Sequence, residues 1–220
     1  MIVTIDGPAG AGKSSVARAL AQRLGFAFLD TGAMYRTVAL AALRQELSWD
    51  DPQALAALAR ASNIEVREDG TFLEGQDVSQ EIRSHAVTSA THYAANNPAV
   101  RVHLVELQRQ VAGRLDIVTE GRDQGTIVFP QAECKIFLDA SPEERARRRQ
   151  ADLAARGEKL SLEEVLADQN RRDESDASRE VGPLVAAVDA VHFSTDGLAA
   201  EEVVDRLEVL VRARMPQPTN

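Results

Sequence analysis

Residues 7–14 read G-P-A-G-A-G-K-S and satisfy the pattern G-x-x-x-x-G-K-[ST]. The glycines of such a loop let backbone N–H groups converge on an anion at the N-terminus of a helix. Its lysine reaches the outer phosphates of a nucleoside triphosphate, and the hydroxyl that follows can ligate Mg²⁺. The residues that this motif predicts to contact ATP are Gly7, Pro8, Ala9, Gly10, Ala11, Gly12, Lys13, Ser14 and Ser15.

A phosphate-binding loop occurs in motor ATPases, GTP switches and small-molecule kinases, so other residues must separate these classes. The guanine-reading segment Asn-Lys-x-Asp of GTP switches is absent from the sequence. The apolar run 117–119 ends in Glu120, whose carboxylate could hold the waters of Mg²⁺ or cap a neighbouring amide. The spacing favours neither role for Glu120, and the metal ligand that the motif itself predicts is Ser14.

Three arginines fall on one face of a predicted helix, because Arg145, Arg148 and Arg149 are spaced i, i+3 and i+4. A phosphoryl group in transfer carries negative charge that arginines on a closing lid can stabilise while they exclude water. The alternative is a solvated face that is paired with Glu143 and Glu144. We favour the catalytic role for the cluster, with Lys13 as the cation of the loop.

Arg172, Asp176 and Arg179 follow at i, i+4 and i+7 on a further predicted helix. This spacing can place a carboxylate between two cations or offer all three groups to a polar ligand, and spacing alone favours a surface salt-bridge ladder. Arg36 and Arg122 differ, because each follows a turn at the end of a predicted strand. Both indicate the place of a second phosphate, and we include Arg122 among the catalytic candidates.

Short apolar runs that alternate with helical patterns predict the elements that position these residues. Residues 64–78 alternate with period two around Glu68-Asp69-Gly70, which predicts an antiparallel hairpin. Ser141 and Ser161 each open a capping box at the start of a helix. The predicted strands are 2–5, 26–29, 116–119, 135–138 and 188–193, and the predicted helices are 13–24, 34–45, 52–63, 98–113 and 199–213, with others from about 79, 142 and 162.

This order of elements predicts one α/β domain over residues 1–220, a doubly wound fold with a phosphate-binding loop. The fold would have a mostly parallel sheet, helices on both faces and a small inserted antiparallel sheet. Ligands of such folds lie at the carboxyl ends of the strands. Asp6, Asp30, Glu120, Asp123 and Asp139 all follow predicted strands closely, so we expect the chemistry at that edge.

The composition limits the partners of the chain. Its 34 acidic residues outnumber 25 basic ones, and the net charge of -9 argues against coating nucleic acid or anionic membrane. The single cysteine, Cys134, excludes an internal disulfide and fits a reducing compartment. No apolar run approaches the ~18 residues of a membrane span. We therefore expect a cytoplasmic protein with neither a nucleic-acid nor a membrane partner.

Four segments together carry a family resemblance: I-D-G-P-A-G-A-G-K-S at 5–14, L-D-T-G-A-M-Y-R at 29–36, G-R-D-Q-G-T-I-V-F-P at 121–130, and residues 172–184, which begin R-D-E-S-D-A-S-R. In order and spacing they resemble the bacterial-type cytidylate kinase family of nucleoside-monophosphate kinases. The first segment is shared by many kinases, whereas the other three are far more specific. The resemblance extends through nearly the whole chain.

The resemblance implies transfer of the ATP γ-phosphoryl group to CMP or dCMP, with Mg²⁺, by a monomer. It also implies an acceptor-binding insert at about 37–105 and a short helical lid at about 145–165. Arg36 and Arg122 would hold the acceptor phosphate, and Asp176 with Arg172 and Arg179 the ribose and nearby phosphates. The CMP-binding residues that it implies are Thr31, Arg36, Arg101, Arg122, Asp123, Arg172, Asp176 and Arg179.

Arg101 and Asp123 would distinguish cytosine from uracil. A carboxylate accepts from the N4 amine of cytosine but opposes the O4 atom of uracil, so UMP should be the poorer substrate. One position departs from the family, because Thr91 and His92 stand where a serine commonly helps to bind the base. His92 could replace that hydrogen bond or simply pack, and we favour packing.

Two other functions stay open. The first is a kinase with the same loop that acts on UMP, AMP or a non-nucleotide acceptor. The second is an ATP-dependent regulatory or binding module that moves its lid without transferring phosphate. Two sets of phosphate-facing arginines, rather than one, argue against the second.

Overall fold

The computed structural model describes residues 1–67, 69–113, 115–155 and 157–215. Residue 68 of the predicted hairpin turn and residue 156 of the predicted lid therefore lie outside the described residues. The chain divides into two compact units, one formed by Met1–Phe28 with Asp116–Asn220 and the other by Leu29–Leu115. Each unit has its own apolar core.

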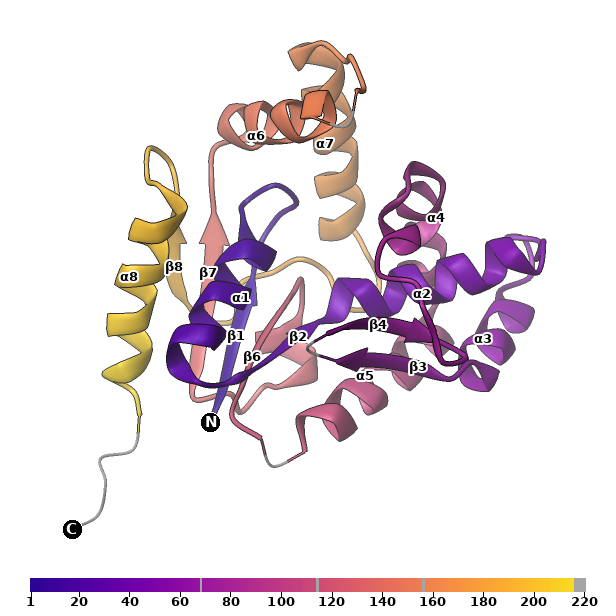
Figure 1. The fold of residues 1–220 in the computed structure, drawn as a ribbon, viewed down its shortest axis with the longest axis horizontal. Coiled ribbons are helices and arrows are strands. Elements are labelled where there is room, and N and C mark those ends of the chain that lie inside the picture. The colour runs from indigo at the N-terminus through magenta and orange to yellow at the C-terminus, as the bar shows by residue number, and fades with distance from the viewer. Residues whose placement is uncertain (68, 114, 156, 216–220) are drawn as a thin grey trace. The chain divides into compact units, whose positions relative to one another are not determined.

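The first unit carries a mostly parallel sheet, as predicted. Its strands have the order β2-β6-β1-β7-β8, and the pairings of β1 with β6, β1 with β7 and β7 with β8 are all parallel. Helices α6 and α7 pack on each other after the carboxyl end of β7 (Figure 1). The strands are β1 (Ile2–Asp6), β2 (Ala27–Asp30, which continues into the second unit), β6 (Ile117–Gly121), β7 (Cys134–Asp139) and β8 (Val191–Ser194). The helices are α1 (Lys13–Leu24), the π-helix η2 (Gln124–Val128), α6 (Pro142–Ala155), α7 (Leu162–Ala177) and α8 (Ala200–Arg212).

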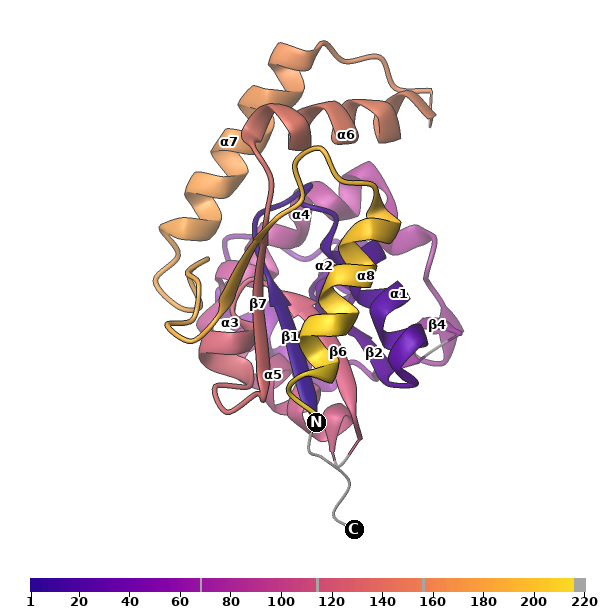
Figure 2. The same ribbon diagram turned by 90° about the vertical axis from the view of Figure 1, so that its left-hand side faces the viewer.

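The core of the first unit explains why α1 begins where the phosphate loop ends. Val16 and Leu20 of α1 pack with Ile5 of β1 and with Leu207 of α8, and all four side chains are buried. Helix α8 lies along α1, as Figure 2 shows from the side. Gly25 ends α1 in the left-handed conformation that its position in the sequence predicts, with φ +70°. The loop 7–12 is thus fixed between a buried strand and a helix with one buried face.

The second unit combines helices with a small antiparallel sheet. Its elements are α2 (Thr31–Arg44), α3 (Pro52–Ala61), β3 (Ile64–Arg67), β4 (Gly70–Leu73), β5 (Gln76–Asp77), the 3-10 helix η1 (Glu81–Arg83), α4 (His85–Asn96) and α5 (Pro98–Ala112). The antiparallel pairing of β3 with β4 and of β4 with β5 confirms the predicted hairpin region. Asp51 and Asn97 cap α3 and α5 through their side-chain oxygens, and each is followed by a first-turn proline.

The sole tryptophan belongs to the second unit. Trp49 stacks on Tyr93, with ring centroids 4.6 Å apart and an interplanar angle of 12°. The side chain of Trp49 also packs against the core of this unit. This stack joins the segment after α2 to helix α4.

The two predicted capping boxes differ in the structure. At Ser161 both hydrogen bonds of the box are present, with Glu164 as the partner. At Ser141 only half of the box forms, because the Oγ of Ser141 accepts from the N–H of Glu144 at 3.4 Å while its own N–H donates to Asp196. The Glu144 carboxylate instead binds Arg148 one turn further along α6, and the N–H of Ser141 has a tertiary partner in Asp196.

One predicted helix is shorter than its charge spacing suggests. Helix α7 ends at Ala177, so Arg179 lies two residues beyond it rather than on the face of Arg172 and Asp176. No helix among the described residues is long and apolar enough to cross a membrane.

Candidate functional site

The phosphate loop of residues 7–12 leads from β1 into the N-terminus of α1. Gly10 and Gly12 have φ values of +82° and +87°, which glycine adopts at least cost. The ammonium of Lys13 is buried and donates to the carbonyl of Pro8 at 2.7 Å. The pKa of Lys13 is lowered to about 7, first by burial and then by the charge of Arg122, while Glu120 and Asp6 act in the opposite direction. A polyanion in this loop would therefore supply the charge that the buried ammonium lacks.

Ser14 and Glu120 face each other at the start of α1. The hydroxyl of Ser14 donates to Oε1 of Glu120 at 2.7 Å, and Glu120 is buried at the end of β6. Two oxygen groups at this distance suit Mg²⁺, which prefers hard oxygen ligands. The described residues contain no cluster of three or more His, Cys, Asp or Glu that could hold a metal without such help.

Arg145 does not face outward with the other arginines of its helix. It is buried, and its guanidinium binds three partners: the carbonyl of Ala140 at 3.0 Å, the carbonyl of Ala9 at 2.9 Å and Oδ2 of Asp173 at 2.6 Å. A Cβ at Gly10 would lie 3.1 Å from Cβ of Arg145, so the first turn of α6 packs directly on the phosphate loop. Arg145 thereby joins the loop, the end of β7 and helix α7.

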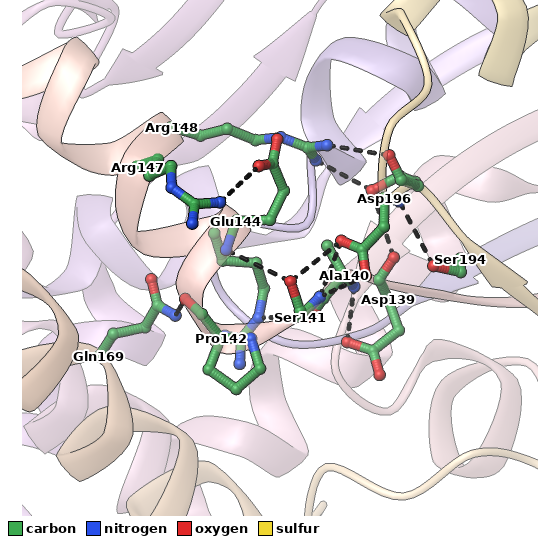
Figure 3. A network of polar contacts seen from close by, with 12 residues as sticks. Asp139, Ala140, Ser141, Pro142, Glu144, Arg147, Arg148, Gln169, Ser194 and Asp196 are labelled. Atoms are coloured by element: carbon green, nitrogen blue, oxygen red, sulfur yellow. Dashed lines mark hydrogen bonds and ion pairs between the residues drawn. The ribbon is translucent and has the colours of Figure 1, made fainter.

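Arg148 lies on the neighbouring part of α6 and reaches the loop that follows β8. Its guanidinium donates to Oγ1 and to the carbonyl of Thr195, each at 2.9 Å, while Nε donates to Glu144 at 3.0 Å. Figure 3 shows Arg148 beside Glu144, with Asp196 reaching Ser141. The predicted pairing of this arginine with a helix carboxylate thus occurs, together with a second contact that the spacing does not indicate.

Arg149 is half-buried, and among the described residues it makes neither a hydrogen bond nor an ion pair. Of the three clustered arginines, one therefore has buried partners, one is tied to the loop after β8, and one has a guanidinium available for an anion. The three arginines therefore differ in their contacts, although their place on one helix face had suggested a shared role.

Arg122, Asp176 and Arg179 form an ion-pair group in the first unit. Nε of Arg122 lies 2.8 Å from Oδ2 of Asp176, and Arg179 lies 2.5 Å from the other oxygen. Burial acts to raise the pKa of Asp176, but Arg122 and Arg179 outweigh it and hold this pKa below its usual value. The carboxylate does lie between two cations, although one of them is Arg122 from another element. Arg172 is exposed, and its charge also lowers the pKa of Asp176.

Asp123 follows β6 and is buried at the start of η2. Behind it, the carboxylate of Asp6 accepts the backbone N–H of Gln124 at 2.9 Å and that of Gly125 at 2.8 Å. Burial raises the pKa of Asp6 to about 6, against the stabilising effect of these two hydrogen bonds. The segment that carries Arg122 and Asp123 is therefore fixed from β1.

In the second unit, Asp30 organises the turn at the start of α2. One oxygen accepts from the N–H of Ala33 at 2.8 Å, and the carboxylate binds Arg36 at 3.2 Å and Arg83 at 3.6 Å. Thr31 is buried beside it as the first residue of α2. Two guanidinium groups at a helix N-terminus suit a dianionic group such as a phosphate.

Arg101 is 3% exposed on α5 and lies over the ring of Tyr35, with 5.6 Å between its Cζ and the ring centroid. Arg101 belongs to the second unit, whereas Asp123 belongs to the first. His92 is exposed on α4, where its Nδ1 lies 2.7 Å from the carbonyl of Ser89 and its ring lies 4.0 Å from that of Tyr93. In the described residues its contacts are thus packing and local hydrogen bonding.

Comparisons with known proteins agree across the length of the chain. The family described as cytidylate kinase matches residues 3–213. A cytidylate kinase of Rhodopirellula baltica is 54% identical over 212 residues, which cover 96% of this chain and 93% of that protein. A cytidylate kinase of Pelotomaculum thermopropionicum is 48% identical over 216 residues, with 96% of each chain covered. The chain belongs to the cytidylate kinase family.

This membership confirms the resemblance that the four sequence segments carry. Among solved structures, an uncharacterized protein from Eubacterium ventriosum has a TM-score of 0.53 at 12% identity, and the match covers 97% of this chain and 99% of that one. That likeness concerns the fold alone. The family match and the mostly parallel sheet together confirm the predicted α/β class.

Sequence reasoning missed Thr195 and the tethering role of Asp6. Thr195 comes directly after β8 and before Asp196-Gly197, at the same carboxyl edge of the sheet as the predicted residues. The position of this turn relative to the last strand was the signal that could have found it. Asp6 was placed at the edge, but its partners at 124 and 125 are 118 and 119 residues away, and no local pattern indicates them.

Proposed function

We propose that this protein transfers the γ-phosphoryl group of ATP to CMP or dCMP and releases ADP with CDP or dCDP. The observation that carries the proposal is the family match over residues 3–213. In the first unit the phosphate loop follows β1, and Arg122 follows the neighbouring strand β6 and pairs with Asp176. An oxygen of the acceptor phosphate attacks the γ-phosphorus as the bond to the β–γ bridging oxygen breaks. The bridging oxygen leaves with ADP.

No strong base is needed, because the acceptor phosphate is already an anion at neutral pH. Catalysis is then alignment together with charge stabilisation. Lys13 and the backbone N–H groups of residues 7–15, other than Pro8, would bind the donor phosphates. Arg148 and Arg149 on α6 would close on the transferred group, which requires Arg148 to exchange its contacts with Thr195 and Glu144 for a phosphate.

The donor set at Ser14 and Glu120 fits Mg²⁺. Ser14 would ligate the ion directly, and Glu120 would hold its waters, since the two groups already lie within hydrogen-bond distance. When bound, the ion would neutralise charge on the donor phosphates. Replacing Glu120 by Gln would keep the hydrogen bond with Ser14 while removing the negative charge.

The family resemblance implies two groups of acceptor-binding residues. Arg122, which pairs with Asp176, would bind the phosphate and ribose together with Arg172, Asp176 and Arg179. Thr31, Arg36 and Arg101 would bind the phosphate and base. Asp123 would accept from the N4 amine of cytosine, for which its burial provides a site of low dielectric where a mismatched acceptor is costly.

The test is ADP formation from Mg-ATP by purified protein with CMP, dCMP, UMP, AMP and no acceptor, measured side by side. Release of ADP with CMP and dCMP alone is the expected result. Equal release of ADP with UMP would support kinase activity but contradict the proposed role of Asp123 and Arg101 in binding cytosine. Release without acceptor, or none at all, would instead support an ATP-dependent regulatory module or another substrate.

Two variants test the role of the loop lysine. Lys13→Ala should reduce kcat by about 100-fold or more, because it removes a charge that acts on the transferring phosphoryl group. Arg206→Ala removes a positive charge from an exposed position on α8, outside the predicted lid, and should leave kcat nearly unchanged. Thermal unfolding of both variants shows whether either loss comes from the fold. Full turnover by Lys13→Ala would remove the proposed role.

A further inference from the structure

The carboxylate of Asp6 has an unusual set of partners for a residue beside a phosphate loop. Asp6 is the last residue of β1, is 3% exposed and precedes Gly7 directly. Yet its Oδ1 accepts the N–H of Gln124 at 2.9 Å and its Oδ2 accepts the N–H of Gly125 at 2.8 Å. Both oxygens thus bind the backbone of the segment that follows β6.

That segment carries two residues for which we propose a role in acceptor binding. Arg122 and Asp123 lie between the end of β6 at Gly121 and the first residue of η2, Gln124. Nε of Arg122 in turn lies 2.8 Å from Oδ2 of Asp176. A second tether acts on the same segment, because Oγ1 of Thr119 donates to Oε1 of Gln124 at 2.9 Å.

We propose that Asp6 is a positioning residue for acceptor binding, which fixes Arg122 and Asp123 through the backbone of Gln124 and Gly125. The strand that ends in the donor loop thereby sets the geometry of the acceptor loop through two backbone hydrogen bonds. This inference rests on the proposed function for its catalytic consequence, while the tether itself can be measured in the free protein.

The chemistry of the tether requires a carboxylate rather than any polar group of that size. Two N–H donors need two acceptor oxygens, and an asparagine offers one oxygen and one NH₂ donor. Asp6→Asn would leave one buried N–H facing another donor, an arrangement that costs more than the loss of one hydrogen bond. We expect the segment to move in response, with the side chains of Arg122 and Asp123.

The chain offers a closely matched control at Thr4. Thr4 lies two residues earlier on β1, on the same face, and a Cβ built at Gly125 would lie 3.0 Å from its Oγ1 and 3.4 Å from Oδ2 of Asp6. Among the described residues its buried hydroxyl has no hydrogen-bond partner. Thr4→Val thus changes a side chain that packs on the same glycine while removing no hydrogen bond.

The first measurement is hydrogen exchange of the free protein. In Asp6→Asn the amides of residues 121–128 should exchange about 10-fold faster than in the wild type, because the tether no longer protects them. Thr4→Val should leave this exchange within about 2-fold of the wild type. Unchanged exchange in Asp6→Asn would overturn the proposal even if the protein proved not to act on CMP.

The second measurement separates positioning from a general loss of activity. Steady-state rates at pH 8, where Asp6 is ionised because its pKa is about 6, should show a KM for CMP about 10-fold higher in Asp6→Asn. The KM for ATP should change less than about 3-fold, and Thr4→Val should resemble the wild type in both constants. An equal rise in both KM values, or no rise for CMP, would overturn the positioning role. Absence of CMP turnover by the wild type would instead contradict the proposed function.

A third variant keeps the proposal testable if Asp6→Asn does not fold. Thr119→Val preserves volume and removes the hydrogen bond to Gln124. It should raise the KM for CMP in the same direction by about 3-fold, with faster exchange confined to residues 121–128. A folded Thr119→Val protein with neither change would show that the position of this segment does not govern CMP binding, and would overturn the proposal.

Discussion

Arg145 of α6 and Asp173 of α7 form an ion pair of 2.6 Å while the same guanidinium holds the carbonyl of Ala9 in the phosphate loop. The side chain of Arg145 is nearly buried, and that of Asp173 is 21% exposed. The second oxygen of Asp173 is buried and, among the described residues, has no hydrogen-bond partner. The pair thus links the donor loop to the helix that carries Asp176.

A double-mutant cycle should show that this pair is energetically coupled. Arg145→Met and Asp173→Asn should each destabilise the protein, and the double variant should lose less than the sum, with a coupling energy of about 1–3 kcal/mol. Urea unfolding measures the free energies. Additive losses of unfolding free energy would show that the ion pair contributes little. A rise in the KM for ATP in Arg145→Met but not in Asp173→Asn would indicate the loss of the hydrogen bond to Ala9.

Gly7 should tolerate no side chain. A Cβ there would lie 1.9 Å from the carbonyl oxygen of Leu138 on β7, and its φ is +148°. Gly7→Ala should therefore reduce the free energy of unfolding by more than about 2 kcal/mol, because backbone must move. Gly25→Ala is the control, since φ is +70° with nothing within 4 Å, and it should cost only about 1 kcal/mol. Equal losses would contradict the close approach of β7 to the loop.

Acid should remove the stabilising contribution of Asp176. Its pKa is held below the usual value by Arg122 and Arg179, against the effect of burial. A carboxylate with a lowered folded-state pKa stabilises the protein at pH values above the unfolded-state pKa of about 3.9, and the contribution is lost as pH falls through the folded-state value. The difference in unfolding free energy between the wild type and Asp176→Asn should be largest near pH 7 and shrink below about pH 4.

Asp168→Asn serves as the comparison for this pH series. Asp168 pairs with Arg171 on the same helix, but both side chains are largely exposed. Its substitution should change the unfolding free energy by less than about 0.5 kcal/mol across the same range, because solvent screens such pairs. If the difference in unfolding free energy between the wild type and Asp176→Asn grew as the pH fell, the predicted pH dependence would be wrong.

Cys134 should be inert to alkylation in the folded protein. Its side chain is 1% exposed on β7, and burial raises the pKa of the thiol to about 11. Since the thiolate is the reacting form, iodoacetamide at pH 8 should modify the native protein at least about 100-fold more slowly than the protein unfolded in urea. Mass spectrometry measures both rates, and similar rates would show that β7 opens readily.

The parts of the fold that depend on local sequence could be predicted. The strand, glycine loop and helix that end at Gly25 follow from short-range periodicity and capping, as do the proline-led helices after Asp51 and Asn97. The family resemblance then implied a set of acceptor-binding residues, three of which, Arg172, Asp176 and Arg179, spacing alone favours as a surface salt-bridge ladder.

The different partners of the three arginines on α6 could not be predicted, because these partners depend on long-range packing. Arg145, Arg148 and Arg149 share one spacing, yet their partners include Ala9 at 136 residues and Thr195 at 47 residues in sequence. Likewise, the second cation of Asp176 is Arg122, 54 residues away. Helical geometry places side chains on a face, whereas the neighbouring elements decide which of them are buried.

Trp49 gives the chain an optical reporter that is confined to one of its halves. Its indole stacks on Tyr93 within Leu29–Leu115, and the sequence holds no other tryptophan. Emission excited at the red edge of the absorption band therefore follows that half alone, while far-ultraviolet dichroism follows the backbone of both. Melting curves recorded by the two signals on one sample would reveal whether the halves lose their structure in a single cooperative step.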